Sequence, residues 1–295
     1  MASDFLATMA DTSFERARQA EAKWSREDLL AQISHLPSPP RLQLSAKGFD
    51  LIAEIKLRSP AAGLLRDLTQ TDIAERAQCY ASAGAAAISI LTEPTRFDGR
   101  LTHLEEGVAA LRSMSTADPE AKPEVPAMRK DFLVNAYQVL EARVAGAGGV
   151  LLIVRMLPSE TLEDMVHTAL AHGLFVLLEV FDEQDVNRAM PVLDRCRASW
   201  AWAQHQPRVL MGVNCRDLVS LQVVPGRLLE LVDCLPRDLP RVAESGLEGV
   251  EDAATFAAAG YDLALVGSAL MRSSSPSILV RDLLQAGRTA RDRPR

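Results

Sequence analysis

The segment LIAEIKLRSPAAG, residues 51–63, begins as a short apolar strand that contains two charges of opposite sign, Glu54 and Lys56. Side chains two residues apart in a strand share a face, so these charges lie on the same side. Charges within an apolar strand cost stability unless they are paired or serve chemistry. Taken alone, the segment also fits an exposed edge strand. The later strands help to decide between an exposed edge strand and a buried strand that carries functional charges.

From residue 51 onward, a short apolar run, a polar loop and a segment of helical length recur eight times. The predicted strands are 51–56, 86–91, 125–130, 149–154, 174–180, 208–214, 240–243 and 262–266. The predicted helices are 70–83, 100–113, 135–146, 158–172, 182–195, 226–234, 247–259 and 276–287. This repetition predicts an α/β fold, a closed (β/α)8 TIM barrel. An open doubly wound sheet is the competing arrangement, but no glycine-rich dinucleotide motif follows the first strand.

The residues before the first repeat predict a helical extension. Apolar positions within 12–35 recur at helical spacing, and the breaker run LPSPP at 36–40 ends that pattern. We therefore expect an N-terminal extension of one or two helices, residues 1–46, followed by the barrel as the catalytic domain, residues 47–295.

The composition indicates an ordinary globular protein. Of 295 residues, 48% are hydrophobic and 24% charged, and the net charge of −7 argues against a nucleic-acid or anionic-membrane partner. No export signal or membrane-length apolar segment is present. The four cysteines lack the spacing of a zinc site or a redox pair, so we expect reduced thiols, no metal and a cytoplasmic location.

Polar residues gather at the carboxyl ends of the predicted strands, where barrels of this type hold their active sites. Two lysines and several glutamates facing one cavity make a general acid/base set, because each group shifts the pKa of its neighbours. We expect lysines that lie near other cations to donate protons most readily at neutral pH. The histidines map away from the strand ends, which favours proton transfer on a carbonyl compound over acyl transfer or metal hydrolysis. The strand-end groups are Glu54, Lys56, Thr92, Glu93, Lys130, Asp131, Glu179, Asn214, Arg216, Glu244, Ser245, Gly267 and Ser268.

The last two repeats predict a phosphate site. Ser245-Gly246 follows the seventh strand, and Gly267-Ser268 follows the eighth. Glycine permits close approach of an anion to backbone amides, and (β/α)8 barrels often bind phosphate at this position. Ser59, after the first strand, can complete the shell. The predicted partner is therefore a phosphorylated small molecule.

Seven segments, in order from residue 47 to 288, resemble the indole-3-glycerol-phosphate synthase family. They are AEIKLRSPAAG, AISILTEPTRFDG, MRKDFLVNAYQVLEARVAGAGGVLLIV, LLEVFDEQDV, GVNCRDL, VAESGL and LALVGSALM. The resemblance implies a lyase of tryptophan biosynthesis that converts 1-(2-carboxyphenylamino)-1-deoxyribulose 5-phosphate to indole-3-glycerol phosphate. Ring closure, loss of carbon dioxide and loss of water occur on a (β/α)8 barrel without a cofactor. Association with other tryptophan-pathway enzymes is a further expectation.

The resemblance also implies a role for each matching residue. Lys130 resembles the general acid that protonates the substrate carbonyl, and Glu179 resembles its acid/base partner. Lys56 resembles the lysine that engages the substrate carboxylate, and whether it also donates a proton stays open. The orienting polar groups are Glu54, Asn214 and Glu244, with Arg216 and Ser245 near the same cavity. The implied phosphate shell is Ser59, Gly246, Gly267 and Ser268, and the implied aromatic-ring contacts are Phe97, Phe132 and Leu218.

Two other functions stay open at this point. A related barrel isomerase, such as phosphoribosylanthranilate isomerase, runs on a cysteine and an aspartate, whereas this chain carries two strand-end lysines and the RKDF segment. A non-catalytic barrel that binds a phosphorylated ligand would keep the same fold, and only turnover separates it from an enzyme. Arg155 departs from the family pattern, because it adds a cation where small or apolar residues are common.

Overall fold

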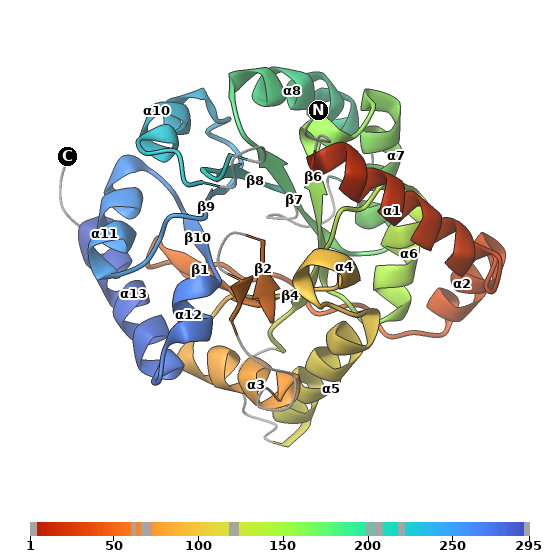
Figure 1. The fold of residues 1–295 in the computed structure, drawn as a ribbon, viewed down its shortest axis with the longest axis horizontal. Helices are drawn as coiled ribbons and strands as arrows, with labels where there is room; N and C mark the ends of the chain where they lie inside the picture. The colour runs from red at the N-terminus through yellow and green to blue at the C-terminus, as the bar shows by residue number, and fades with distance from the viewer. Residues whose placement is uncertain are drawn as a thin grey trace.

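A computed structural model describes residues 5–60, 63–65, 72–117, 124–198, 202, 209–217 and 222–291. Eight parallel strands close into a barrel with helices around it (Figure 1). The strands are β1 (Asp50–Ile55), β4 (Ala87–Leu91), β5 (Ala127–Lys130), β6 (Gly149–Ile153), β7 (Phe175–Val180), β8 (Val209–Asn214), β9 (Arg241–Glu244) and β10 (Leu263–Val266). Their order around the barrel is β1-β10-β9-β8-β7-β6-β5-β4, closed by the pairing of β1 with β4. The predicted (β/α)8 barrel is confirmed, and the open sheet is wrong.

The helices also follow the predicted pattern, because capping residues fix their ends. Asp72 and Asn135 accept hydrogen bonds from backbone amides in the first turns of α3 and α6, while Gly84 and Gly260 end α3 and α11 with positive φ. The barrel helices are α3 (Ile73–Ala83), α5 (Leu101–Ala117), α6 (Ala136–Val144), α7 (Ser159–Ala171), α8 (Glu183–Arg197), α10 (Arg227–Leu231), α11 (Val250–Ala259) and α13 (Pro276–Arg291).

Several short helices and strands lie in the loops between the barrel elements. An antiparallel pair, β2 (Arg58–Ser59) and β3 (Gly63–Leu64), follows β1. The single turns are α4 (Pro94–Phe97), α12 (Ser268–Arg272) and the 3-10 helices η1 (Val154–Met156) and η2 (Val232–Cys234). Of these, α12 begins at Ser268, within the predicted phosphate site.

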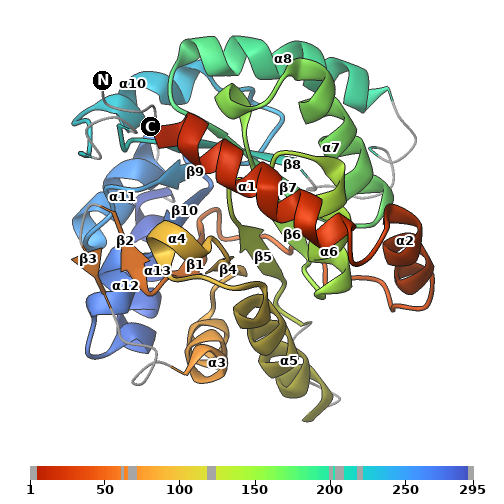
Figure 2. The same cartoon turned by 45° about the vertical axis from the view of Figure 1, so that its right-hand side comes forward.

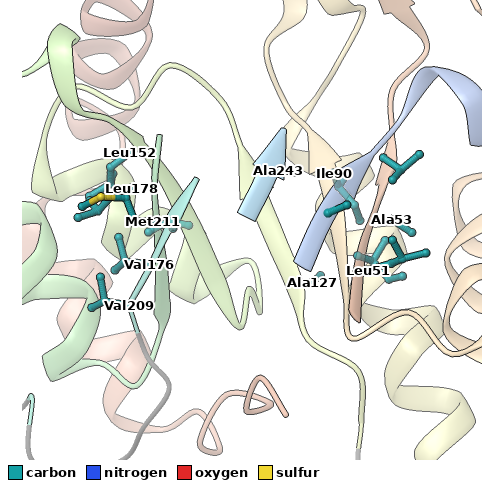
Figure 3. Packing of buried hydrophobic residues seen from close by; sticks show 14 of the residues in the cluster. Leu51, Ala53, Ile90, Ala127, Leu152, Val176, Leu178, Val209, Met211 and Ala243 are labelled. Carbon is teal, nitrogen blue, oxygen red and sulfur yellow. The ribbon is translucent and has the colours of Figure 1, made fainter. Parts of the chain in front are cut away.

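Alternation along the strands separates two apolar layers. Leu51 and Ala53 point outward into the layer between strands and helices (Figure 3), while Ile52 packs inside the barrel. Since side chains alternate along a strand, Glu54 shares the inner face with Ile52. β1 is paired on both sides and fully buried, so the edge-strand interpretation is wrong.

Two helices precede the barrel, α1 (Phe5–Glu21) and α2 (Arg26–Ser34). The predicted helical extension is confirmed, although it begins at Phe5, before the predicted residue 12. α1 crosses in front of β6 and α6 (Figures 1 and 2). Arg16 on α1 donates two hydrogen bonds to Asp131, at 2.8 and 2.9 Å, which anchors the helix at the end of β5. The division of the chain at residues 46 and 47 stays a prediction.

Candidate active site

One cavity lies at the carboxyl ends of the barrel strands, with a volume of about 990 Å³ that is open to solvent. Every predicted site residue that the structure describes lines it, and Leu218 lies outside the described residues. The predicted lining residues are Glu54, Lys56, Ser59, Phe97, Lys130, Phe132, Glu179, Asn214, Arg216, Glu244, Ser245, Gly246, Gly267 and Ser268. Their common location follows from parallel strands, whose carboxyl ends all meet at one end of the barrel.

Lys130 reaches across the cavity from the end of β5 to carboxylates on two other strands. Its Nζ lies 3.0 Å from Oε2 of Glu179 on β7 and 3.7 Å from Oε2 of Glu244 on β9. All three side chains are largely buried, with 18%, 3% and 1% of their surfaces exposed. An acid and a base therefore lie in direct contact where solvent is mostly excluded.

The carboxylates around Lys130 control its pKa. Burial acts to lower the pKa of this ammonium group, but Glu179, Glu244 and Glu54 together outweigh burial, and the pKa of Lys130 is raised. The expectation that nearby cations would ease proton donation is therefore wrong for this lysine, whose neighbours are anions. Lys130 therefore holds its proton more firmly than a free lysine does.

Glu244 is buried beside another carboxyl group, unlike an ordinary carboxylate at the protein surface. Burial first, and then the charge of Glu179, raise the pKa of Glu244 well above its usual range. Two neighbouring carboxyl groups in a dry site resist ionising together. Glu244 thus takes up a proton more readily than a free glutamate.

Glu54 and Lys56 form a second acid and base pair. The Nζ of Lys56 lies 2.7 Å from Oε1 of Glu54, which is 2% exposed. Burial acts to raise the pKa of Glu54, yet Lys56, Lys130 and Arg216 outweigh it and the pKa is lowered. Gly267, which follows the neighbouring strand β10, leaves room for this pair, since a Cβ there would lie 2.1 Å from Oε1 of Glu54.

The turn after β9 has an unusual backbone. Ser245 and Gly246 both adopt positive φ, at 67° and 72°. Such a conformation is rare for serine and is found most often at functional sites. Cys215 packs beneath this turn, and burial raises the pKa of its thiol, so the cysteine is a neutral packing residue.

Aromatic rings form the apolar wall of the cavity. The rings of Phe97 and Phe132 have centroids 6.0 Å apart, and Phe5 meets Phe132 edge-on at 5.8 Å. The prediction from sequence missed Phe5, because its place in the cavity depends on how α1 packs on the barrel. Leu91, Leu151, Ile153 and Leu265 complete the wall. They were also missed, although their inward-facing positions follow from strand alternation.

Two residues at a strand end serve the scaffold and do not line the cavity. Glu93 is buried and caps α4, accepting hydrogen bonds from the amides of Thr95 and Arg96. Thr92 donates a hydrogen bond to Asp131 at 2.7 Å. Thr92 and Glu93 do follow a strand end as predicted, but the expectation that they face the cavity was wrong.

Arg155 lies in η1, beside the site but not in its lining. Its Nε donates to Oδ2 of Asp185 at 2.8 Å, a second nitrogen donates to Asp182, and the guanidinium lies 4.6 Å from the ring centre of Phe181. These contacts join the loop after β6 to the start of α8. The extra cation therefore has a structural role.

The described residues hold neither a metal-binding cluster nor a membrane-spanning helix. In the described ranges, no three or more His, Cys, Asp or Glu side chains are grouped so that they could hold a metal ion. None of the helices within those ranges has the length and apolar character needed to cross a membrane.

Comparisons with known proteins agree with this geometry. A family model described as indole-3-glycerol phosphate synthase matches residues 11–283. An indole-3-glycerol phosphate synthase of Mycolicibacterium vanbaalenii is 36% identical over 287 residues, covering 95% of each chain. One from Rhodococcus jostii is 38% identical over 254 residues, covering 85% of this chain and 84% of the relative.

Solved structures share the fold at low identity. Thiamine phosphate pyrophosphorylase from Pyrococcus furiosus superposes with a TM-score of 0.55 and 16% identity, over 83% of this chain and 97% of that chain. The 3-hexulose-6-phosphate synthase of Salmonella typhimurium has a TM-score of 0.53 and 13% identity, over 82% and 99%. These similarities concern the barrel alone.

Proposed function

The chain belongs to the indole-3-glycerol phosphate synthase family, and we propose that Lys130, Glu179 and Lys56 carry out the chemistry of that family here. The activity is indole-3-glycerol phosphate synthesis in tryptophan biosynthesis, a carboxy-lyase reaction. The assignment of roles to residues rests chiefly on one observation, the contact of Lys130 with Glu179 inside a cavity with an apolar wall.

The chemistry of the substrate matches the two ends of the cavity. The substrate carries a benzoate ring at one end and a phosphate at the other, so it needs an apolar wall, a cation for the carboxylate and amide donors for the phosphate. Phe97 and Phe132 supply the wall, while Lys56 supplies the cation. The proposed phosphate shell is Ser59, Ser245, Gly246, Gly267 and Ser268.

Ring closure begins with proton transfer from Lys130. The ring carbon that bears the carboxylate attacks the substrate carbonyl carbon, and the Nζ of Lys130 gives its proton to the carbonyl oxygen, which becomes a hydroxyl. Loss of carbon dioxide leaves its bonding electrons on the ring. The raised pKa of Lys130 keeps the proton in place until substrate separates the ammonium from Glu179.

Dehydration completes the indole. Lys56 gives a proton to the new hydroxyl, which leaves as water, and Glu179 removes a proton from the closed ring, so that a double bond forms. Its contact with Lys130 in the resting site shows that the two groups reach the same region. Asn214, Glu54, Glu244 and Arg216 orient the substrate and the two lysines in this proposal.

Location and assembly are proposed on other grounds. All four cysteines are free thiols, which supports a reducing compartment such as the cytoplasm. Association with other enzymes of tryptophan biosynthesis is proposed from the family resemblance alone.

A turnover assay tests the proposed function. Purified protein is mixed with 1-(2-carboxyphenylamino)-1-deoxyribulose 5-phosphate, and indole absorbance and fluorescence are followed. We expect product from the wild-type protein and none from Lys130→Met. A folded wild-type protein that makes no product would favour the non-catalytic barrel, and isomerisation of phosphoribosylanthranilate would favour the isomerase.

A further inference from the structure

Gly212 lies in the middle of β8 and has no functional group of its own. In the barrel it pairs with Glu179 on β7 and with Val242 on β9. Gly212 is not among the described glycines whose φ is positive, the conformation that favours glycine. The backbone conformation at position 212 therefore does not require glycine, and the reason for glycine lies in the space around it.

A side chain at position 212 would collide with Glu244. A Cβ there would lie 2.1 Å from Oε1 of Glu244 and 3.0 Å from Cδ1 of Leu177. Optimal contacts between uncharged heavy atoms lie near 3.5–4.0 Å, so the first distance is strongly repulsive. The carboxyl group of Glu244 thus occupies the volume that any larger residue would fill.

The space left at Gly212 and the charged groups beside it together place this carboxyl group. The side chain of Glu244 is 1% exposed, and its carboxyl group lies within hydrogen-bonding reach of the carboxyl group of Glu179. Its nearest cation, Lys130, lies 3.7 Å away. In a closely packed interior, a side chain settles in the volume that its neighbours leave open, and for Glu244 that volume lies over Gly212.

We infer that Gly212 is a positioning residue of the active site, whose missing side chain seats the carboxyl group of Glu244 beside Lys130 and Glu179. The inference rests on the proposed roles of Lys130 and Glu244. A larger residue would push Glu244 toward the cavity, where it would disturb both the Lys130 ammonium and the space for substrate.

A double-mutant cycle tests this inference. Gly212→Ala should lower kcat about a hundredfold, the effect of misplacing a catalytic group by about 1 Å, with a smaller change in KM. Glu244→Asp shortens the side chain by one methylene and withdraws the carboxyl group from position 212. The double variant should therefore recover at least about tenfold in kcat over Gly212→Ala, a departure from additivity that reports direct coupling.

Gly149 provides a matched control in the barrel interior. A Cβ at Gly149 would lie 2.4 Å from the ring of Phe175, so Gly149→Ala also creates a clash, but one with the apolar core. We expect Gly149→Ala to lower stability while the folded fraction keeps its kcat. Glu244→Asp should not rescue it.

Each outcome of the cycle decides the inference. A Gly212→Ala protein with kcat within about threefold of wild type, or a double variant no more active and no better folded than Gly212→Ala, would overturn it. Should Gly212→Ala not fold, recovery of folding in the double variant supports the inference.

The inference can be separated from the proposed function. If the wild-type protein showed no turnover, the proposed function would fail. The same variants would then be compared by infrared difference spectroscopy without substrate, in place of kcat. The carboxyl band of Glu244, identified by its loss in Glu244→Gln, should shift in Gly212→Ala. An unchanged band would then count against Gly212.

Discussion

The ammonium group of Lys130 lies 3.0 Å from the carboxylate of Glu179, although the two residues stand on strands separated by β6. The contact crosses the barrel interior, where Leu151 and Ile153 on β6 keep one wall apolar. Because both groups are largely buried, removing either one takes away a charged partner of the other.

Lys130→Met is expected to abolish turnover while sparing ligand binding. A general acid contributes about a hundredfold to ten-thousandfold to a rate, so kcat should fall by about a thousandfold or more. Because that contribution is made in the transition state, the Kd for inorganic phosphate should stay within about tenfold. Steady-state kinetics and calorimetry measure the two quantities.

The control for Lys130 is Lys47→Met, which removes an exposed lysine before β1. Its kcat and phosphate affinity should match those of the wild-type protein. Normal turnover by Lys130→Met would refute the role assigned to this lysine.

Glu244→Gln is expected to change how stability depends on pH. The pKa of Glu244 is raised in the folded protein, so the folded state binds more protons than the unfolded state above the usual glutamate pKa of 4.5. The free energy of unfolding of the wild type therefore falls as pH rises above that value. Glutamine cannot ionise, so the variant should lose less stability between about pH 5 and pH 8.

Urea unfolding at several pH values measures this difference. Glu105→Gln removes an exposed glutamate on α5 and should follow the wild-type curve. Parallel pH dependences for wild type and Glu244→Gln would mean that Glu244 titrates as an ordinary carboxylate.

Arg16→Met is expected to weaken the attachment of α1 to the barrel. The change leaves Asp131, which is fully buried, without its two hydrogen bonds from Arg16 and should lower the free energy of unfolding by about 2 kcal/mol. KM should rise as well, because α1 carries Phe5 into the cavity. Denaturant titration and steady-state kinetics provide both numbers.

The neighbouring Arg18→Met serves as the control. Arg18 pairs with Glu15 on the exposed face of α1, so its loss should leave unfolding and KM unchanged. Equal effects from the two variants would show that α1 is held by its apolar contacts and not by the Arg16–Asp131 pair.

Acid should release the same attachment. Burial acts to raise the pKa of Asp131, but hydrogen bonds from Arg16 and the charge of Arg129 outweigh it and lower the pKa to about 2. The stabilisation from Asp131 is thus complete above its unfolded pKa of 3.8 and is lost as pH falls through about 2. Asp131→Asn should remove this part of the acid transition, as followed by circular dichroism.

Arg155→Ala is expected to lower stability more than activity. Asp185 is almost fully buried and would lose its charged donor, at an expected cost of about 2 kcal/mol. The cavity does not include Arg155, so kcat should change little. Arg195→Ala breaks an exposed pair with Glu163 and should have little effect on unfolding. A loss of kcat without a loss of stability would place Arg155 in the chemistry.

Local signals in the sequence were sufficient for the fold. Apolar runs of strand length, helix caps such as Asp72 and the glycine at position 84 place the elements to within a few residues. Strand ends in a parallel barrel meet at one end, so the order of the elements also brought Lys130, Glu179 and Glu244 to one cavity.

The sequence by itself determined the order of the repeats, the barrel and the types of residue at the mouth. Tertiary structure alone decided which of those groups touch. In the folded protein, Glu93 caps α4 and Phe5, near the N-terminus, lines the cavity. Lys130 lies among carboxylates. Periodicity is a property of neighbours along the chain. A pKa, or the space that Gly212 leaves for the carboxyl group of Glu244, depends on atoms that only packing brings together.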